Sequence, residues 1–170
     1  LHPQGILGYE QIEAAVLNVA RYDVFKLGEA VLAGQVSRAL RMLEGLEAEG
    51  EAAVLVHWTL AEDIRALKRI KDAMADGKPL PMALKEARVW GMKERLYERV
   101  LPALADHQLA HLVQAASVCD GVIKGLKHPD WPLDPWSALK RLMLLVMQQV
   151  VSAPGSHAAA APKLRLALQA

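Results

Sequence analysis

The chain has 170 residues, of which 53% are hydrophobic and 5% aromatic, and its formal net charge is +1 at pH 7. This length suits one domain, or one domain with a piece of another. The balance of 20 basic and 19 acidic residues excludes the strongly basic composition that would argue for direct nucleic-acid binding. The one cysteine, Cys119, excludes an internal disulfide and any multi-cysteine zinc site.

Ala and Leu supply much of the apolar content, and apolar residues recur at steps of three and four, which predicts helices packed on helices. The first residue is Leu1 rather than Met, so we expect a fragment of a longer protein. After a Gly/Pro-containing lead-in, a first helix carries an apolar stripe of Ile12, Ala15, Val16 and Val19. Asp23 is a suitable N-cap for a second helix. In chain order, the helices predicted for the first half are Tyr9–Val19, Asp23–Ala33, Val36–Glu49 and Glu51–Ala75.

The second half begins with a predicted turn over residues 76–81, because one glycine and two prolines cannot sit inside a helix. The helices expected next are Met82–Val89, Met92–Leu104, bent or ended by Pro102, and Asp106–Leu126. The third of these presents an apolar stripe of Leu109, Leu112, Ala116, Cys119, Ile123 and Leu126. No segment alternates convincingly between apolar and polar residues, so we predict no strands and an all-α fold, a helical bundle.

The last predicted helix starts at Asp134 and Pro135, where a capping carboxylate precedes proline at the first helical position, and runs to Val151. Its most apolar part, Leu142 to Val151, is too short to span a membrane and contains two glutamines. Residues 152–170 show little periodicity and are predicted to form a tail that is weakly ordered or loosely docked.

Catalytic patterns are missing from the sequence. No glycine-rich phosphate loop of the GxxxxGK[ST] type is present, and no serine lies in a nucleophile-elbow pattern. The neighbouring carboxylates Glu62 and Asp63 lie beside Arg65 and Lys68, and we interpret them as solvated helical charge pairs. We therefore predict no catalytic residues, no cofactor and no ATP site on this chain.

A metal site is the first alternative to weigh. His107 and His111 are four positions apart on one predicted helix, a spacing that suits a metal, and Cys119 is a conceivable third ligand for a small helical metalloenzyme. Zinc needs three or four converging ligands, and Cys119 falls on the apolar stripe. The spacing therefore favours two surface histidines and a buried, inert thiol.

A basic cluster on the long helix is the second alternative. It consists of Arg65, Lys68, Arg69 and Lys71. It could contact DNA or an acidic partner, as in a standalone helical nucleic-acid-binding module. It could equally be a solvated outer face balanced by Glu62, Asp63 and Asp72. The second interpretation is favoured, because isolated surface charges carry little specificity.

The order of several short motifs resembles one protein family, the delta subunit of the bacterial DNA polymerase III clamp loader. The resemblance covers about Tyr9 to Val151. Its first part is the run Tyr22-Asp23-Val24-Phe25-Lys26-Leu27-Gly28-Glu29-Ala30, followed by Ala33-Gly34, Arg38-Ala39-Leu40-Arg41-Met42-Leu43 and Glu49-Gly50-Glu51, then Leu60, Asp63, Arg65 and Leu67. Its second part is Arg88-Val89-Trp90, then Leu109, Ala116, Asp120, Lys124 and Gly125, and finally Asp134-Pro135-Trp136.

The resemblance implies a division into domains. Residues 1–21 would be the end of a small helical lid domain, residues 22–151 the C-terminal helical collar, and residues 152–170 a tail that the resemblance does not cover. The collar would pack against the equivalent domains of the ATP-binding gamma/tau subunits and of delta prime. Candidate core or interface anchors are the four tryptophans, Trp58, Trp90, Trp131 and Trp136.

The resemblance also implies a function. The fragment would have no intrinsic activity and would help to assemble the complex that loads the sliding clamp on DNA during replication. Delta grips the clamp through an N-terminal domain that is absent from this sequence, and DNA would be met only indirectly. Other subunits of the holoenzyme, a DNA-directed DNA polymerase, would supply the nucleotidyltransferase and ATPase activities. The implied location is the bacterial cytoplasm.

Overall fold

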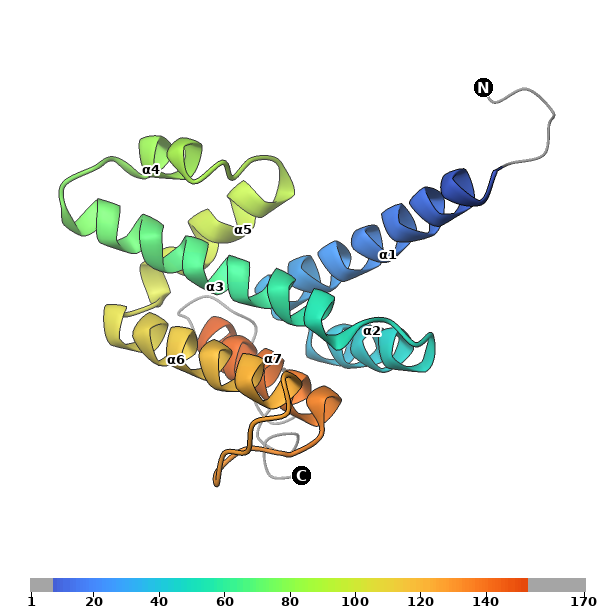
Figure 1. Ribbon diagram of the computed structural model, residues 1–170. Coiled ribbons are helices and arrows are strands. Elements are labelled where there is room, and N and C mark those ends of the chain that lie inside the picture. The colour runs from blue at the N-terminus through green and yellow to red at the C-terminus, as the bar shows by residue number, and fades with distance from the viewer. Residues whose placement is uncertain (1–7, 153–170) are drawn as a thin grey trace.

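The computed structural model describes residues 8–152, apart from the side chains of residues 17–22 (Figure 1). Within this range the chain is all-α, as predicted, and contains no strand. The helices are α1 (Tyr9–Leu32), α2 (Val36–Ala48), α3 (Ala53–Ala75), α4 (Leu80–Glu86), α5 (Met92–Val100), the short 3₁₀ helix η1 (Leu101–Ala103), α6 (Asp106–Ile123) and α7 (Pro135–Val151). The predicted lead-in and nearly all of the predicted tail lie outside the described residues.

Helix α3 is the centre of the arrangement. It packs against α1, α4, α6 and α7, while α6 and α7 pack on each other (Figure 1). The central core is apolar and includes Leu27, Ile64, Leu109 and Leu142, each at most 1% exposed. This burial explains the sequence period, since residues three and four apart share one face of a helix.

The prediction of two separate helices at the start of the chain is wrong. Helix α1 runs without a break from Tyr9 to Leu32, so Asp23 lies inside it rather than at an N-cap. An N-cap residue must leave helical geometry, and residues 19–22 contain neither glycine nor proline to interrupt the backbone. The second half of α1 packs in the bundle, and its first half projects away from it (Figure 1).

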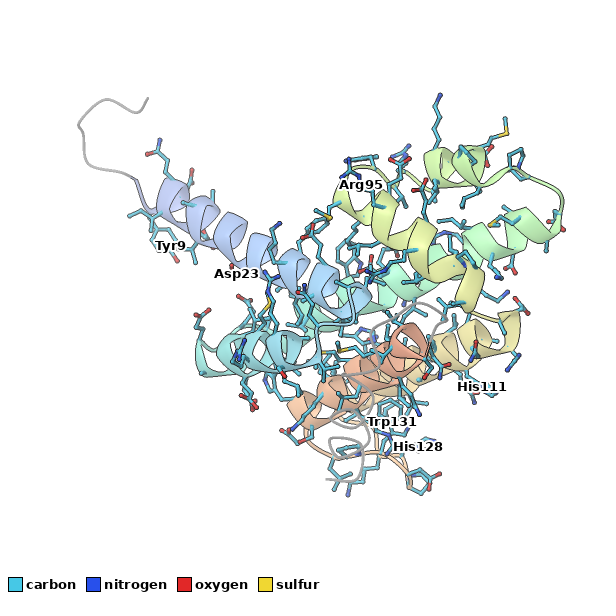
Figure 2. All side chains as sticks on the ribbon, turned by 180° about the vertical axis from the view of Figure 1, so that it is seen from behind. Tyr9, Asp23, Arg95, His111, His128 and Trp131 are labelled. Carbon is cyan, nitrogen blue, oxygen red and sulfur yellow. The ribbon has the colours of Figure 1, made fainter. Side chains whose placement is uncertain are left out.

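The projecting part of α1 leaves its apolar stripe uncovered. Tyr9 is 80% exposed, Ile12 49% and Val16 62%, and Tyr9 lies at the outer end of the helix (Figure 2). The apolar residues predicted to face inward on this segment do lie on one stripe, but the described residues do not bury them.

Helix ends in the second half follow the local chemistry. Proline at position 102 ends α5, and the chain tightens there into η1, as expected for a residue without a backbone N–H. The predicted cap at Asp134 is confirmed, because its Oδ2 accepts a hydrogen bond of 2.8 Å from the backbone N–H of Ser137. Helix α4 begins and ends earlier than predicted, and its first turn tolerates Pro81.

The predicted stripe of α6 is too long at its end. The helix stops at Ile123, Gly125 adopts a φ of 89°, and Leu126 is 68% exposed beyond the turn. Glycine takes this left-handed conformation at no steric cost, which ends the helix one turn before the apolar pattern does. Among residues 8–152, no helix combines the length and the apolar character needed to cross a membrane.

Candidate subunit interface

A groove opens on the surface where α1, α3 and α5 meet. Its volume is about 680 Å³, and its lining residues are Phe25, Leu55, Trp58, Thr59, Glu62, Asp63 and Lys93. We call it the aromatic groove, because Trp58 is 60% exposed and Phe25 46% exposed beside it. Leu55, Trp58, Thr59 and Glu62 follow one another at helical steps, so a single face of α3 forms one wall.

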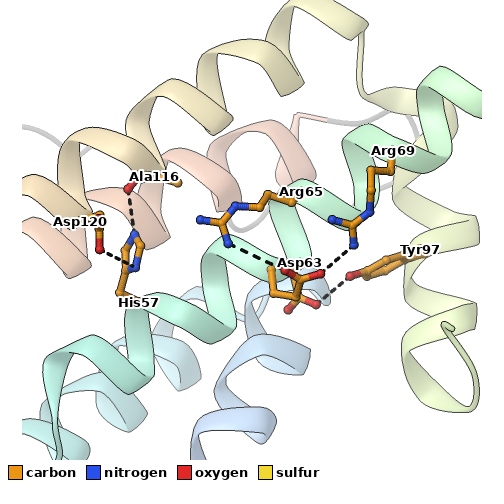
Figure 3. Close-up of polar contacts among 8 residues, drawn as sticks. His57, Asp63, Arg65, Arg69, Tyr97, Ala116 and Asp120 are labelled. Atoms are coloured by element: carbon orange, nitrogen blue, oxygen red, sulfur yellow. Dashed lines mark hydrogen bonds and ion pairs between the residues drawn. The ribbon is translucent and has the colours of Figure 1, made fainter. Parts of the chain in front are cut away.

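A buried polar cluster forms part of the lining of the aromatic groove. Asp63 is only 6% exposed, and its Oδ1 accepts a hydrogen bond of 2.7 Å from the Tyr97 hydroxyl (Figure 3). The same oxygen accepts a second hydrogen bond, of 2.6 Å, from Lys93 Nζ. Lys93 Nζ also lies 4.4 Å from the centroid of the Phe25 ring, a cation–π contact. These contacts tie α5 to α3 and to α1.

The interpretation of Asp63 as a solvated charge pair is therefore wrong. Its partners lie on α5, the second helix after α3 along the chain, rather than on the next turn of α3. A signal was present in the sequence, because Asp63 falls three residues after Leu60 and seven after Val56 on the inward stripe. The α5 residues that pair with it, Lys93 and Tyr97, carry no comparable signal.

The Tyr97 hydroxyl stays protonated and donates its hydrogen bond within this cluster. Burial, with a smaller contribution from the neighbouring Asp63 carboxylate, raises the pKa of Tyr97 well above its ordinary value. The hydroxyl therefore keeps its proton at neutral pH and remains a hydrogen-bond donor to Asp63.

The second oxygen of Asp63 lies against the backbone of α1. Its Oδ2 is buried without a hydrogen-bond partner among the described residues. A Cβ added at Gly28 would come within 2.9 Å of this oxygen. Glycine at position 28 thus lets α1 approach the carboxylate closely, and the ionic contact with Lys93 offsets the missing hydrogen bond.

We expect Gly28→Ala to lower the free energy of unfolding by about 1 kcal/mol. Overpacking costs about 1–3 kcal/mol, because Asp63 is held by Tyr97 and Lys93 and cannot swing aside freely. Alanine's better helix propensity returns about 0.8–1.0 kcal/mol. Urea denaturation followed by circular dichroism measures the difference.

The matched control for this change is Gly45→Ala. Gly45 lies within α2, and a Cβ added there would meet no atom within 4 Å. The control should raise stability by about 0.5–1 kcal/mol through helix propensity alone. Equal stabilisation by both substitutions would show that Asp63 does not occupy the space beside Gly28.

The predicted basic cluster is largely paired within the chain. Arg69 Nη2 lies 2.7 Å from Glu62 Oε1, and Arg65 Nη1 lies 3.8 Å from Glu62 Oε2 (Figure 3). The Lys68 ammonium contacts Asp72 and also Asp106 at 3.1 Å. The hydrogen bonds that it donates to Asp72 and then to Asp106 raise the pKa of Lys68.

Lys71, the fourth member of the cluster, turns inward and donates to the carbonyl of Leu101 at 2.8 Å. Each of the four cations thus has a partner within the chain. No contact in the described residues specifically favours DNA on this face.

The four tryptophans occupy two kinds of place. Trp58 and Trp90 are both exposed. Trp90 is 71% exposed and lies in the turn between α4 and α5. In this turn Arg88 has a φ of 56° and Gly91 a φ of 69°. Trp131 and Trp136 are partly buried and pack against the core, and the Arg141 guanidinium lies 4.9 Å from the centroid of the Trp131 ring. Trp58 alone among them lines the aromatic groove.

The candidate metal ligands are not brought together. His107 and His111 lie on the exposed side of α6 with ring centroids 6.3 Å apart, whereas Cys119 is fully buried. Burial, helped by the nearby Asp120 carboxylate, raises the pKa of the Cys119 thiol to about 12. In the described part of the chain, no group of three His, Cys, Asp or Glu side chains is placed to hold a metal ion.

His57 is a buried link between α3 and α6. It is 4% exposed, its Nε2 donates to the carbonyl of Ala116 at 2.8 Å, and its Nδ1 lies 3.8 Å from Asp120 Oδ1 (Figure 3). Asp120 also pairs with Lys124, and this hydrogen bond lowers the pKa of the Asp120 carboxyl. The geometry gives His57 a packing role beside the aromatic groove rather than a place in it.

The helical bundle matches a known protein family. Residues 24–153 match the family model described as "Processivity clamp loader gamma complex DNA pol III C-term". This match covers the greater part of the chain and spans the bundle from the packed half of α1 through α7. The fold is therefore that of a clamp-loader C-terminal helical domain.

The chain belongs to the family of C-terminal domains of the DNA polymerase III clamp-loader delta subunit. It is 30% identical over 146 residues to DNA polymerase III subunit delta of Escherichia coli (strain K12). The matched region is 86% of this chain and 41% of that relative, so the chain spans about two fifths of the relative's length.

Proposed function

We propose that this chain is the non-catalytic collar of a clamp-loader delta subunit, through which delta assembles with other subunits of the complex that loads the sliding clamp on DNA. The observation that carries the proposal is the family match over residues 24–153, which coincides with the described helical bundle. Its partners would be the ATP-binding gamma/tau subunits and delta prime. The clamp would be met through another part of the delta polypeptide, and DNA through the assembled complex, in the bacterial cytoplasm.

We also keep the proposal that residues 1–21 end a lid domain and residues 22–151 form the collar. The exposed stripe on the projecting half of α1 supports it. At 3.6 residues per turn, Tyr9 lies about five turns before Leu27, so the exposed stripe continues the core-facing side of the same helix. An apolar stripe in that position suits a helix that leaves one packed domain and enters another. Helix α1 would then be a rigid connection between the two.

The experiment is a co-elution assay. The 170-residue chain is mixed with the gamma and delta prime subunits of its own species and run on a sizing column. We expect it to leave the column with them, as a collar should, because a subunit interface of standard size buries about 1,600 Å². Separate migration of a chain that circular dichroism shows to be helical would refute the proposal.

A further inference from the structure

We infer that the aromatic groove binds the apolar face of a helix that a neighbouring subunit of the clamp loader contributes. The inference rests on the proposed function and names the surface that would perform it. Trp58 and Phe25 present two exposed aromatic rings in one concave site, and Leu55 belongs to the same lining. Trp is enriched among the residues that dominate binding energy at protein interfaces, and Phe is enriched in interface cores.

The charges of the groove select an uncharged occupant. Of its two lining carboxylates, Asp63 is held by Lys93 and Tyr97, and Glu62 is held by Arg69 at 2.7 Å. Lys93, the lining cation, is in turn occupied by Asp63 and lies over the Phe25 ring. No lining charge is left to attract a phosphate or an acidic peptide, so an apolar surface complements the groove better than nucleic acid does.

The size of the groove suits side chains from one helix. Its volume of about 680 Å³ is comparable to sites that hold a small ligand, about 300–1,000 Å³. A partner helix can insert apolar side chains three and four residues apart into such a groove. The neighbouring exposed Val54, four residues before Trp58 on α3, extends the apolar surface along the helix axis. This extension favours an elongated occupant over a single small molecule.

The walls of the groove are already ordered. The Asp63 cluster links α3 to α5, and the Lys93 contact restrains the Phe25 ring on α1. A surface whose side chains are held before binding loses less conformational freedom on association. The buried cluster thus positions the groove and does not itself need to touch the partner.

The test is a binding measurement on the complex. Trp58→Ala and Phe25→Ala are introduced into the delta polypeptide that contains this chain, and its dissociation constant with the gamma and delta prime subunits is measured by calorimetry. We expect each substitution to weaken binding at least tenfold, as for residues that dominate an interface. Because Trp58 is 60% exposed, Trp58→Ala should change the thermal melting of the free subunit little. Phe25→Ala also removes the contact with Lys93, so its binding loss is interpreted together with its melting temperature.

Met82→Ala is the matched control. Met82 is 55% exposed, similar to Phe25, but lies on α4, which contributes nothing to the lining of the groove. Its dissociation constant should stay within about twofold of the unsubstituted value, since exposed apolar residues outside a contact add little. A Trp58→Ala variant that binds as tightly as Met82→Ala would overturn the inference while leaving the collar proposal intact.

Two other outcomes separate the remaining explanations. If the unsubstituted subunit does not bind gamma and delta prime, the proposed function itself is wrong. If sedimentation shows that delta alone forms a dimer that Trp58→Ala dissolves, the groove holds a second copy of this chain, and the inferred partner is wrong.

Discussion

Replacing Asp63 by alanine should lower the free energy of unfolding by about 3–5 kcal/mol, the largest effect we expect from a single polar side chain in this protein. The substitution strips Lys93 Nζ and the Tyr97 hydroxyl of their shared acceptor. Lys93 has only 15% of its side chain exposed, and Tyr97 is 1% exposed, so water cannot easily replace the carboxylate. Since whole domains are stable by only about 5–15 kcal/mol, the loss should be evident in a urea denaturation curve.

A double-mutant cycle identifies the cause of that loss. Asp63→Asn retains an acceptor for Tyr97 but removes the charge that Lys93 faces, and Lys93→Met removes the cation while keeping a long side chain. If the ion pair is the source, the double variant should lose less stability than the sum of the two single losses. Strictly additive losses would show that the loss at Asp63 does not come from its ion pair with Lys93.

Shortening Leu142 to alanine should cost about 2–5 kcal/mol, the range observed when buried leucines are truncated. Leu142 is fully buried at 0% exposure on α7, which packs on α6, α3, α1 and α2. The substitution removes apolar contacts and leaves a cavity that helices on several sides cannot close together. The same urea titration, with an unchanged slope, measures the difference as a shift of the midpoint.

Leu133→Ala provides the comparison of identical chemistry. Leu133 lies in the loop before α7 and is 65% exposed, so its truncation should change stability by no more than about 0.5 kcal/mol. Similar losses at the two positions would mean that the burial of Leu142 on α7 does not set the cost of its truncation. A loss confined to Leu142 would confirm that the tertiary packing of α7 stabilises the bundle.

Much of the fold could be predicted from the sequence because it depends on neighbours along the chain. Helical period, the Asp134-Pro135 start and the stop at Pro102 involve groups within about one turn of each other. Apolar residues of α3 recur at steps of three and four in the sequence, and Val56, Leu60 and Ile64 in that series are all buried. The ordered motifs also indicated the delta family, which the match over residues 24–153 confirms.

The local rules failed where two of them competed. Asp23 has the chemistry of an N-cap, but continuous helix propensity on both sides carried α1 through it. Glu62 and Asp63 are adjacent and both lie near basic residues, yet Glu62 pairs along α3 and Asp63 pairs across to α5. Sequence spacing cannot distinguish these outcomes, because the second depends on which helix packs over that turn.

By itself, then, the sequence determined which segments are helices, which faces of them are apolar, and the family to which they belong. Only the tertiary structure decided that Phe25, Trp58 and Lys93 form one groove, that Gly28 admits the Asp63 carboxylate, and that each cation of the basic cluster has a partner within the chain. The physical reason is range: helix formation is settled by hydrogen bonds four residues apart, whereas Asp63 meets its partners at separations of 30 and 34 residues. Such contacts exist only once α1, α3 and α5 have packed together.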